Sequence, residues 1–247
     1  MRIDILTLFP EMCERVLDES IIGRARKNGI IDVNCHNIRD YTSDKHRHVD
    51  DMPYGGGQGM LMKPEPIADC FDAVARQCSS KPYFIYMSPK GRVFNQQIAR
   101  ELMAHENICL LCGHYEGIDQ RIIDSMIDME ISVGDYVLTG GELPALIVTD
   151  AVCRMVPGVL AENVCFEEES HYDGLLEHPQ YTRPPEWRGM SVPNELLSGH
   201  HANIAKWKRQ QALAQTAKYR PDLIEKAELT ENERKLFCVN KSDDMTE

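Results

Sequence analysis

The order of apolar and polar positions along the chain predicts alternating strands and helices. Residues 2–9 are mostly apolar, include β-branched side chains and stop at a proline, which predicts a strand. Residues 10–27 have helical spacing through Met12, Val16 and Ile22, which predicts one helix.

The same alternation continues to about residue 155. Further strands are predicted at 30–38, 83–87, 108–112 and 129–133, and further helices at 64–78, 95–106, 119–127 and 142–155. The polar, histidine-rich residues 40–53 predict a loop. Because strands that alternate with helices are expected of parallel βαβ units, we predict an α/β fold whose parallel sheet is buried on both faces.

A change of pattern divides the chain. Periodicity disappears in residues 161–173, which carry a run of acidic side chains and are predicted to form a linker. Prolines mark loops in the part that follows, and helices are predicted at 201–219, 223–227 and 231–237. The predicted organisation is a larger domain over 1–160, the linker over 161–173 and a small all-helical domain over 174–247.

The charge balance limits how the chain can hold nucleic acid. Its 247 residues include 39 acidic and 27 basic side chains, and the net charge of −12 is unfavourable for wrapping a polyanion. Contact with nucleic acid must then come from local basic patches. On the predicted helix 201–219, Lys206, Lys208 and Arg209 accompany Trp207; a merely solvated helix face is the alternative.

The cysteines indicate a reducing compartment. All nine are scattered without a framework of pairs, and no signal segment precedes the first strand, so we expect a cytoplasmic protein with free thiols. Cys109 and Cys112 have CxxC spacing, but they fall in a predicted strand, where residues three apart face opposite sides. We therefore predict no metal or redox site there. No apolar run is long enough to span a membrane.

Three predicted strands end in loops that contain glycine or proline. Their sequences are Ser-Pro-Lys-Gly at 88–91, Gly-His-Tyr-Glu-Gly at 113–117 and a longer run at 132–144 with three glycines. Glycine lets the backbone approach a ligand closely, and in open α/β sheets ligands bind outside the carboxyl ends of the strands. The loops therefore predict one crevice for a nucleotide-like ligand, with ordinary strand-to-helix turns as the alternative.

A fourth glycine-rich segment lies at 52–59, with the sequence Met-Pro-Tyr-Gly-Gly-Gly-Gln-Gly. It lacks the Gly-Lys-Ser/Thr ending of a phosphate loop and does not open into a helix. It can form a thin wall against which a flat base lies, or a flexible surface loop. Asp50 precedes it, and a carboxylate can accept hydrogen bonds from N1 and N2 of guanine; a solvated aspartate is the alternative.

Together these segments closely resemble the bacterial tRNA (guanine-N1)-methyltransferases, from Met1-Arg-Ile-Asp through Leu197-Ser-Gly-His-His. The resemblance implies a SPOUT-superfamily enzyme that transfers a methyl group from S-adenosylmethionine to N1 of the guanosine 3′ to the anticodon, position 37 of tRNA. It also implies a trefoil knot in the C-terminal part of the α/β domain and a helical domain that holds the anticodon stem-loop. The family is a homodimer with shared active sites. A magnesium requirement stays open.

The resemblance also implies the site residues. Glu169 takes the place of the aspartate that serves the family as general base, which is a departure from the family pattern, and Arg154 offsets charge on guanine O6. Asp50 reads the guanosine 5′ to the target. Cofactor contacts are expected of Tyr86, Ser88, Pro89, Gly113, Tyr115, Glu116, Gly117, Val133, Gly134, Asp135, Tyr136, Val137, Leu138, Gly140, Gly141 and Pro144. Contacts to RNA are expected of Gly55, Gly56, Gly57, Gly59, Lys206, Lys208 and Arg209.

Two other functions remain open from sequence. A ribose 2′-O-methyltransferase of the same fold would need an activated hydroxyl instead of a carboxylate near guanine N1. A non-enzymatic RNA-binding protein would use the glycine loops only as structure. Binding of S-adenosylmethionine separates the last from both enzymes, and the identity of the methylated nucleoside separates the two enzymes.

Overall fold

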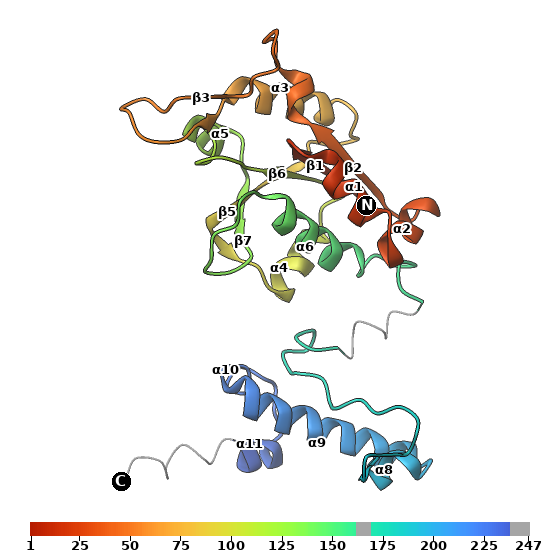
Figure 1. Ribbon diagram of the computed structural model, residues 1–247. Coiled ribbons are helices and arrows are strands. Elements are labelled where there is room, and N and C mark those ends of the chain that lie inside the picture. Colours follow the sequence, from red (N-terminus) through yellow and green to blue (C-terminus); the bar gives the residue numbers. More distant parts are fainter. Residues whose placement is uncertain (162–168, 238–247) are drawn as a thin grey trace, which may run out of the picture. The chain divides into compact units, whose positions relative to one another are not determined.

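The computed structural model describes residues 1–161 and 169–237, in two compact units, Met1–Asn163 and Val164–Glu247. The first unit is built on β1 (Arg2–Thr7), β2 (Asp32–Asn37), β5 (Tyr83–Val93), β6 (Asn107–Cys112) and β7 (Met129–Ser132). These strands form one sheet in the order β2-β1-β6-β5-β7, and every neighbouring pair is parallel (Figure 1). The predicted α/β class with a parallel sheet is confirmed.

Helices cover both faces of this sheet (Figure 1). They are α1 (Pro10–Leu17), α2 (Ser20–Lys27), α3 (Pro64–Ala75), α4 (Gln96–Leu102), α5 (Gln120–Ser125) and α6 (Glu142–Cys153). On one face α3 and α5 pack in a core with Phe84 and Leu111, and on the other α6 packs against α1 and α4. Successive side chains of β6 point to opposite faces and all are buried, so the sheet is buried on both faces as predicted.

The helix predicted over residues 10–27 is in fact two helices, so that prediction was wrong. The apolar positions that carried the helical spacing are not all buried. Cys13 and Leu17 of α1 are buried, whereas Met12 and Val16 are 43% and 54% exposed. Both pairs have the same i, i+4 spacing, so periodicity alone does not decide which one turns inward.

Strand β5 is longer than the strand predicted at 83–87. It continues through a bulge, since Met87 and Arg92 both pair with Ile131 of β7. A Cβ on Gly91 would lie 2.4 Å from the backbone of β7. Glycine there permits close packing of the two strands and does not end the strand.

Two short elements, η1 (Ile38–Tyr41) and β3 (Asp50–Asp51), overlap the predicted loop at 40–53, and a third, β4 (Leu61–Met62), follows the glycine-rich segment. Strands β3 and β4 pair antiparallel, so the glycine-rich residues 52–59 form an excursion that leaves and returns at one place (Figure 1).

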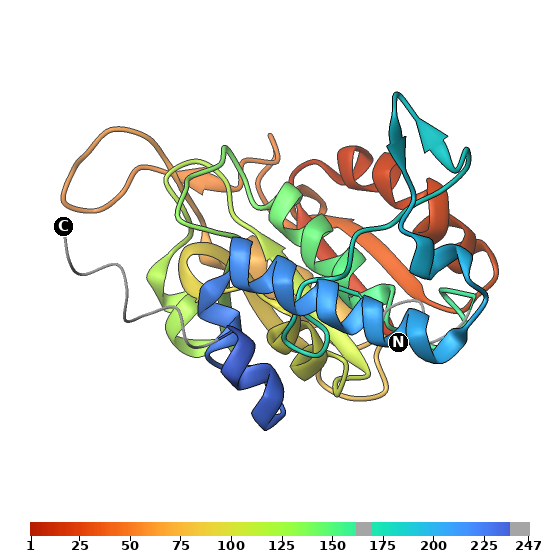
Figure 2. The same cartoon turned by 90° about the horizontal axis from the view of Figure 1, so that it is seen from below.

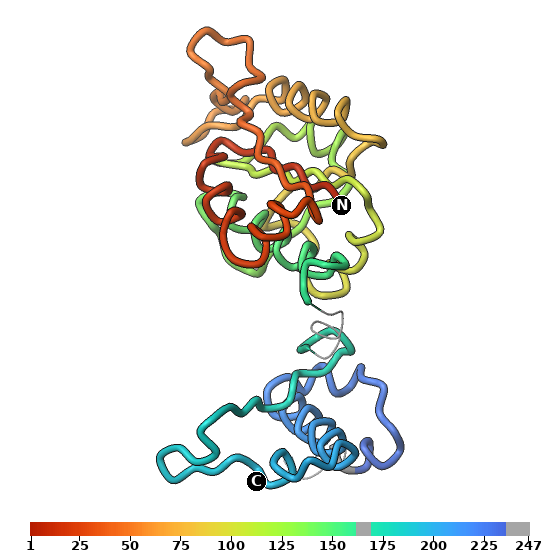
Figure 3. Tube along the Cα trace, turned by 90° about the vertical axis from the view of Figure 1, so that its right-hand side faces the viewer, coloured from red at the N-terminus to blue at the C-terminus, as the bar shows by residue number. Residues whose placement is uncertain are grey.

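The second unit contains α8 (Asn194–Leu197), α9 (His201–Tyr219), α10 (Pro221–Ile224) and α11 (Glu231–Phe237). Both α10 and α11 contact α9 (Figure 3), and Leu175, Leu213 and Ile224 form the core. The bounds of α9 and α11 coincide with those expected from sequence. The helix expected at 223–227 instead begins at Pro221, because proline suits the first helical position.

A β-hairpin precedes these helices and was not predicted. Strand β8 (Glu186–Trp187) pairs antiparallel with β9 (Met190–Ser191), and the two short arrows are visible in Figure 2. The prolines around it led us to expect only loops. Of the predicted linker, residues 162–168 lie outside the described residues.

Candidate active site

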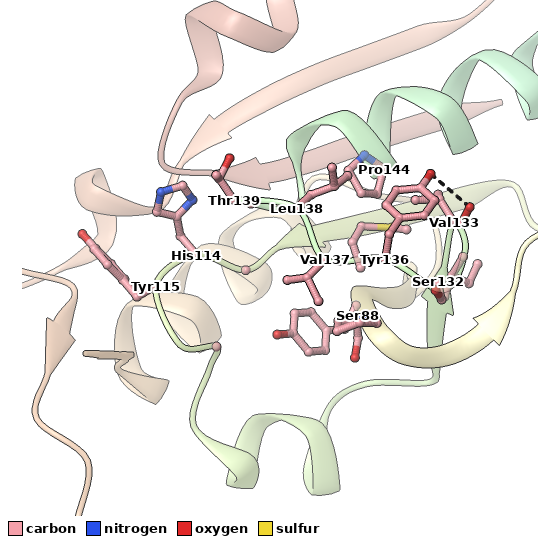
Figure 4. A pocket seen from close by; sticks show the side chains of 18 of the residues that line it. Ser88, His114, Tyr115, Ser132, Val133, Tyr136, Val137, Leu138, Thr139 and Pro144 are labelled. Carbon is pink, nitrogen blue, oxygen red and sulfur yellow. Dashed lines mark hydrogen bonds between the residues drawn. The ribbon is translucent and has the colours of Figure 1, made fainter. Parts of the chain in front are cut away.

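A cavity of about 220 Å³, whose lining side chains are drawn in Figure 4, opens at the carboxyl ends of β6 and β7 and beside the bulged middle of β5. Two strand ends and the bulge therefore converge on one crevice; the prediction that a strand ends before residues 88–91 was wrong, because β5 continues to Val93. The residues that line it are Tyr86, Met87, Ser88, Pro89, Gly113, His114, Tyr115, Glu116, Gly117, Ile131, Ser132, Val133, Tyr136, Val137, Leu138, Thr139, Gly140, Gly141 and Pro144.

Backbone hydrogen bonds hold the loops of this pocket together. The amide of Gly141 donates to the carbonyl of Gly113 at 2.9 Å, which joins the loop after β7 to the loop after β6. The amide of Glu116 donates to the carbonyl of Met60 at 3.0 Å, which joins the second loop to the segment after the glycine-rich excursion. The pocket is thus preformed by packed backbone.

Two positions in the pocket require glycine because neighbouring protein atoms lie too close for a side chain. A Cβ on Gly141 would lie 2.6 Å from the Cα of Cys112, and one on Gly113 would lie 2.8 Å from the ring and hydroxyl of Tyr86. A side chain at either position would have to displace β6 or the Tyr86 ring. The close approach is to other parts of the protein; the predicted close approach to a ligand stays a prediction.

Hydrogen bonds between its own residues stabilise the loop after β7. The hydroxyl of Ser132 donates to the carbonyl of Gly134 at 2.9 Å. The hydroxyl of Tyr136 donates to the carbonyl of Val133 at 3.3 Å, which is the dashed line in Figure 4. Gly134 has a φ of 146°, and a Cβ there would lie 2.6 Å from the Tyr136 ring. The loop keeps its shape through its own residues.

Burial raises the pKa of one phenol in the pocket, that of Tyr86. Tyr86 is almost fully buried, and burial, with a smaller contribution from the charge of Glu130, raises the pKa of its phenol to about 12. The Tyr86 hydroxyl therefore stays protonated at neutral pH and is able to donate a hydrogen bond within the pocket.

The structure brings together every residue expected to contact the cofactor except Gly134 and Asp135, which do not line the cavity. Whether the others contact a cofactor stays a prediction. Sequence reasoning missed Met87, His114, Ile131, Ser132 and Thr139, although all of them lie within or next to the three loops already singled out.

His114 is the most informative of the missed residues. Its ring contacts the rings of Phe9 and Tyr115, with centroid distances of 5.1 and 5.3 Å. Its Nδ1 atom is buried and has no hydrogen-bond partner within the described part of the chain. Buried polar atoms are normally satisfied, so this atom is available to a bound water or to a polar group of a ligand. A polar residue between Gly113 and Tyr115 was the available sequence signal.

Arg154 is not among the lining residues. It caps the C-terminal end of α6, whereas Pro144, near the other end of that helix, lines the pocket. At 1.5 Å per residue the two positions are about 15 Å apart along the helix axis. The structure therefore does not bring Arg154 to the pocket of its own chain.

Glu169 belongs to the second unit, where its carbonyl accepts a hydrogen bond from the amide of Tyr172 at 3.3 Å. Its side chain is half-buried. The neighbouring Glu167 and Glu168 lie outside the described residues. The assignment of Glu169 as a base stays a prediction.

The glycine-rich segment at residues 52–59 contacts the pocket through Gly59. Gly59 has a φ of 88°, and a Cβ there would lie 2.4 Å from the side chain of Glu116, which lines the cavity. Gly55 and Gly56 also have positive φ, with nothing within 4 Å of a Cβ, and Gly57 has positive φ. Asp50, in β3, is half-buried at the start of this excursion. Gly55 and Gly56 therefore face open space, and whether a base lies against them stays a prediction.

The expected RNA-contacting residues of α9 differ in their surroundings. Lys206 is exposed and Lys208 is half-buried. Arg209 donates to Glu233 at 3.0 Å and to the carbonyl of Glu228 at 3.2 Å, and lies 3.7 Å from Asp173. Arg209 therefore links α9 to α11 and to residues 173 and 228 within the second unit.

Other predicted features concern metals and membranes. Cys109 and Cys112 are fully buried in β6, and burial raises the pKa of both thiols well above the ordinary value, so neither is a ready thiolate ligand. Over residues 1–161 and 169–237, no cluster of three or more His, Cys, Asp or Glu side chains is arranged to hold a metal. None of the helices described there is long and apolar enough to cross a membrane.

A pocket made of glycine-bearing loops at the carboxyl ends of parallel strands is the ligand site of the open α/β class. The family model described as tRNA (Guanine-1)-methyltransferase TrmD matches residues 1–226. The chain therefore belongs to the tRNA (guanine-1)-methyltransferase family. The resemblance seen in the glycine-bearing loops is confirmed.

Individual relatives agree with this placement. The tRNA (guanine-N(1)-)-methyltransferase of Ruminiclostridium cellulolyticum is 57% identical over 226 residues, covering 92% of this chain and 97% of the relative. That of Clostridium beijerinckii is 55% identical over 238 residues, covering 96% and 98%, and that of Desulforamulus reducens is 52% identical over 238 residues, covering 96% and 94%. The chain is thus an enzyme of this family that uses S-adenosylmethionine, and the non-enzymatic alternative is set aside.

Proposed function

We propose that the pocket at the ends of β6 and β7 and beside the bulge of β5 binds S-adenosylmethionine and that the enzyme methylates N1 of the guanosine at position 37 of tRNA. The observation that carries this proposal is the convergence of the β5 bulge and two glycine-bearing loops on one preformed crevice in a chain of this family. When bound, S-adenosylmethionine supplies an electrophilic methyl group on its sulfonium sulfur.

The residues present fit such a cofactor. Gly113 and Gly141 let the loops pack closely against Tyr86 and Cys112, which holds loop backbone at the wall of the pocket, where a flat adenine-like group could lie against it. The unpartnered Nδ1 of His114 and the protonated phenol of Tyr86 are polar groups available to its hydroxyl or carboxylate groups.

The chemistry needs a base. Guanine N1 carries a proton at neutral pH, so a group must remove it as the nitrogen is methylated. We assign this role to the carboxylate of Glu169. We assign the guanidinium of Arg154 to offset the negative charge that grows on O6, because a fixed cation stabilises such charge in a water-poor site.

In a homodimer, Arg154 could reach the pocket of the partner protomer, although it lies away from the pocket of its own chain. Leu143 and Ile147 of α6 are 48% and 46% exposed, and helical spacing places Arg154 on the same stripe as these two residues. Met12 and Val16 of α1, which packs against α6, are similarly exposed. A second copy that covers this apolar surface would bring Arg154 of one protomer toward the pocket of its partner.

The trefoil knot also belongs to this proposal. Strand β7 lies at the edge of the sheet, yet α6 returns to pack on β6 and β1 near the centre. On the way, Gly141 contacts the backbone of the loop that follows β6. This path is the one expected if the segment between β7 and α6 passes through the loop that follows β6, as it would in a trefoil knot.

We further propose a division of labour in binding tRNA. Asp50 and the wall formed by Gly55, Gly56, Gly57 and Gly59 hold bases of the anticodon loop, and the second unit, with Lys206 and Lys208, contacts the phosphate backbone. We place the enzyme in the cytoplasm with its cysteines reduced. We assign no residue to magnesium.

Transfer of a labelled methyl group to unmodified tRNA tests the function. We expect 1-methylguanosine as the product, located at position 37, and no product from a transcript with adenosine at that position. A ribose-methylated nucleoside, or label elsewhere in the tRNA, would contradict the proposal.

A further inference from the structure

The tip of the β8–β9 hairpin carries an exposed apolar pair. Trp187 and Met190 are paired across the two strands, next to the turn, and are 55% and 61% exposed. Cross-strand partners point to the same face of a hairpin. Their surface is therefore one continuous patch at the end of the second unit's hairpin.

This patch continues into a groove. Residues two apart on a strand share a face, so Pro185 lies on the face of Trp187 and Val192 on the face of Met190. The amide of Val192 donates to the carbonyl of Pro185 at 2.9 Å, which extends the pairing. Both of these residues line a cavity of about 520 Å³, together with Tyr181, Thr182, Arg183, Leu196 and Leu197.

The turn itself is unusual. Arg188 and Gly189 have φ values of 52° and 77°, the geometry of a two-residue hairpin turn that favours asparagine or glycine at both positions. An arginine there adopts a backbone conformation that non-glycine residues rarely use, and such strain is concentrated at functional sites. Its guanidinium carbon lies 4.6 Å from the centroid of the Trp187 ring, so the turn places a cation over the exposed indole.

We propose that this hairpin and groove hold an unpaired nucleobase of the tRNA substrate, an inference that rests on the proposed function. Aromatic rings and guanidinium planes are the groups on which proteins stack unpaired bases. Arg183 and Arg188 supply positive charge for the adjoining phosphates, and no carboxylate is among the residues that line the groove. Contact with a second copy of this chain would use the apolar patch but would leave the cation at its tip without a role.

The test measures tRNA binding by the full-length enzyme with substitutions at the hairpin tip. Loss of one stacked base weakens binding by roughly 5- to 150-fold, and we expect that for Trp187→Ala. Trp187→Phe should keep most of the affinity, because a ring remains. Arg188→Gly suits the turn geometry and should weaken binding while lowering the salt slope by about one. Ser191→Ala, on the opposite face of the hairpin, is the matched control and should bind as the parent does.

Outcomes that overturn the inference are distinct from failure of the proposed function. Unchanged tRNA affinity in Trp187→Ala would remove the hairpin from the RNA surface. A loss of dimer in that variant, measured by sedimentation, would make the patch a contact between copies of the chain. In both cases methylation of position 37 by the wild-type enzyme would leave the proposed function standing. Binding of S-adenosylmethionine should be the same in all variants.

Discussion

The hydroxyl of Thr7, at the end of β1, donates a hydrogen bond of 2.7 Å to the carboxyl of Glu142, the first residue of α6. Both side chains are buried, and the same hydroxyl accepts a hydrogen bond from the amide of Phe9 at 2.9 Å. Glu142 directly follows Gly141, which lines the pocket. This contact therefore ties the last pocket loop to the end of β1.

Replacement of Thr7 by valine should destabilise the first unit. It removes both hydrogen bonds and leaves a buried carboxyl oxygen without its donor, which costs about 1–3 kcal/mol in the free energy of unfolding. Affinity for S-adenosylmethionine should also fall, because the start of α6 is freed. Urea unfolding and calorimetric titration measure the two effects. Thr7→Ser keeps the hydroxyl and should resemble wild type; equal stability of the valine variant would show that the contact is dispensable.

Of the basic residues of α9, Lys206 and Lys208 should affect tRNA binding, whereas Arg209 should affect stability. Substituting Lys206 and Lys208 together by alanine should lower the salt slope of tRNA binding by roughly two, because each phosphate contact contributes about one. Arg209→Ala should instead lower the thermal midpoint, because it breaks the contacts with Glu233 and Asp173. Filter binding over a range of salt concentrations, with thermal unfolding in parallel, measures both. A parental slope in the double variant would exclude that helix as the phosphate-contacting surface.

Asp4 should make stability depend on pH in the acid range. Burial alone would raise the pKa of this fully buried carboxyl, but hydrogen bonds from His36 and Arg2 outweigh it, so the pKa lies below the ordinary value of 3.8. A lowered folded pKa means that the stabilisation is complete above 3.8 and is lost as the pH falls through the folded value.

Asp4→Asn tests this directly. At pH 7 it should cost about 3 kcal/mol in the free energy of unfolding, since it removes one partner of a buried charge pair. The difference from wild type should shrink as the pH falls below 3.8, where the wild-type carboxyl takes up its proton. A difference that is the same at pH 7 and pH 3, measured by urea unfolding, would contradict the proposed role of the ionised carboxylate.

Shared active sites can be tested by mixing two inactive variants. A Cβ on Gly140 would lie 2.3 Å from Glu142 Oε2 and 2.6 Å from Nδ1 of the pocket residue His114, so Gly140→Val should displace these side chains and distort the pocket, while Arg154→Ala should lose its cation. If pocket and arginine come from different protomers, exchanging equal amounts should restore about a quarter of wild-type activity, since half of the dimers are mixed and each has one intact site. No recovery, with mixed dimers verified by mass, would place both groups in one chain.

Much of the first unit could be predicted from sequence because its signals are local. Each strand is a short apolar run, and each pocket loop directly follows a strand, so Gly113 and Gly141 were found without knowledge of the sheet. The inward face of α1 could not be predicted, because Cys13 and Leu17 compete with Met12 and Val16 at identical spacing. The packing of α1 against α6, β2 and β1 decides between them.

Other features depend on contacts between distant residues. The ion pairs of Arg209 join positions far apart in the chain, so sequence could only register a basic side chain. His114 was missed for a similar reason, since its ring packs against Phe9 from the start of the chain. The hairpin at Trp187 has strands of two residues, too short for a period to be recognised.

The most direct measurement concerns Glu169, where this chain departs from the family. Removing a general base typically costs about 10² to 10⁴ in rate, so Glu169→Ala should lose single-turnover methyl transfer on that scale while keeping its affinity for S-adenosylmethionine and tRNA. Glu169→Asp should keep most activity if the carboxylate can adjust its position, and alanine at Glu167 or Glu168 should have little effect. Wild-type rates in Glu169→Ala would contradict the account and move the search for the base to Glu168 or Asp173.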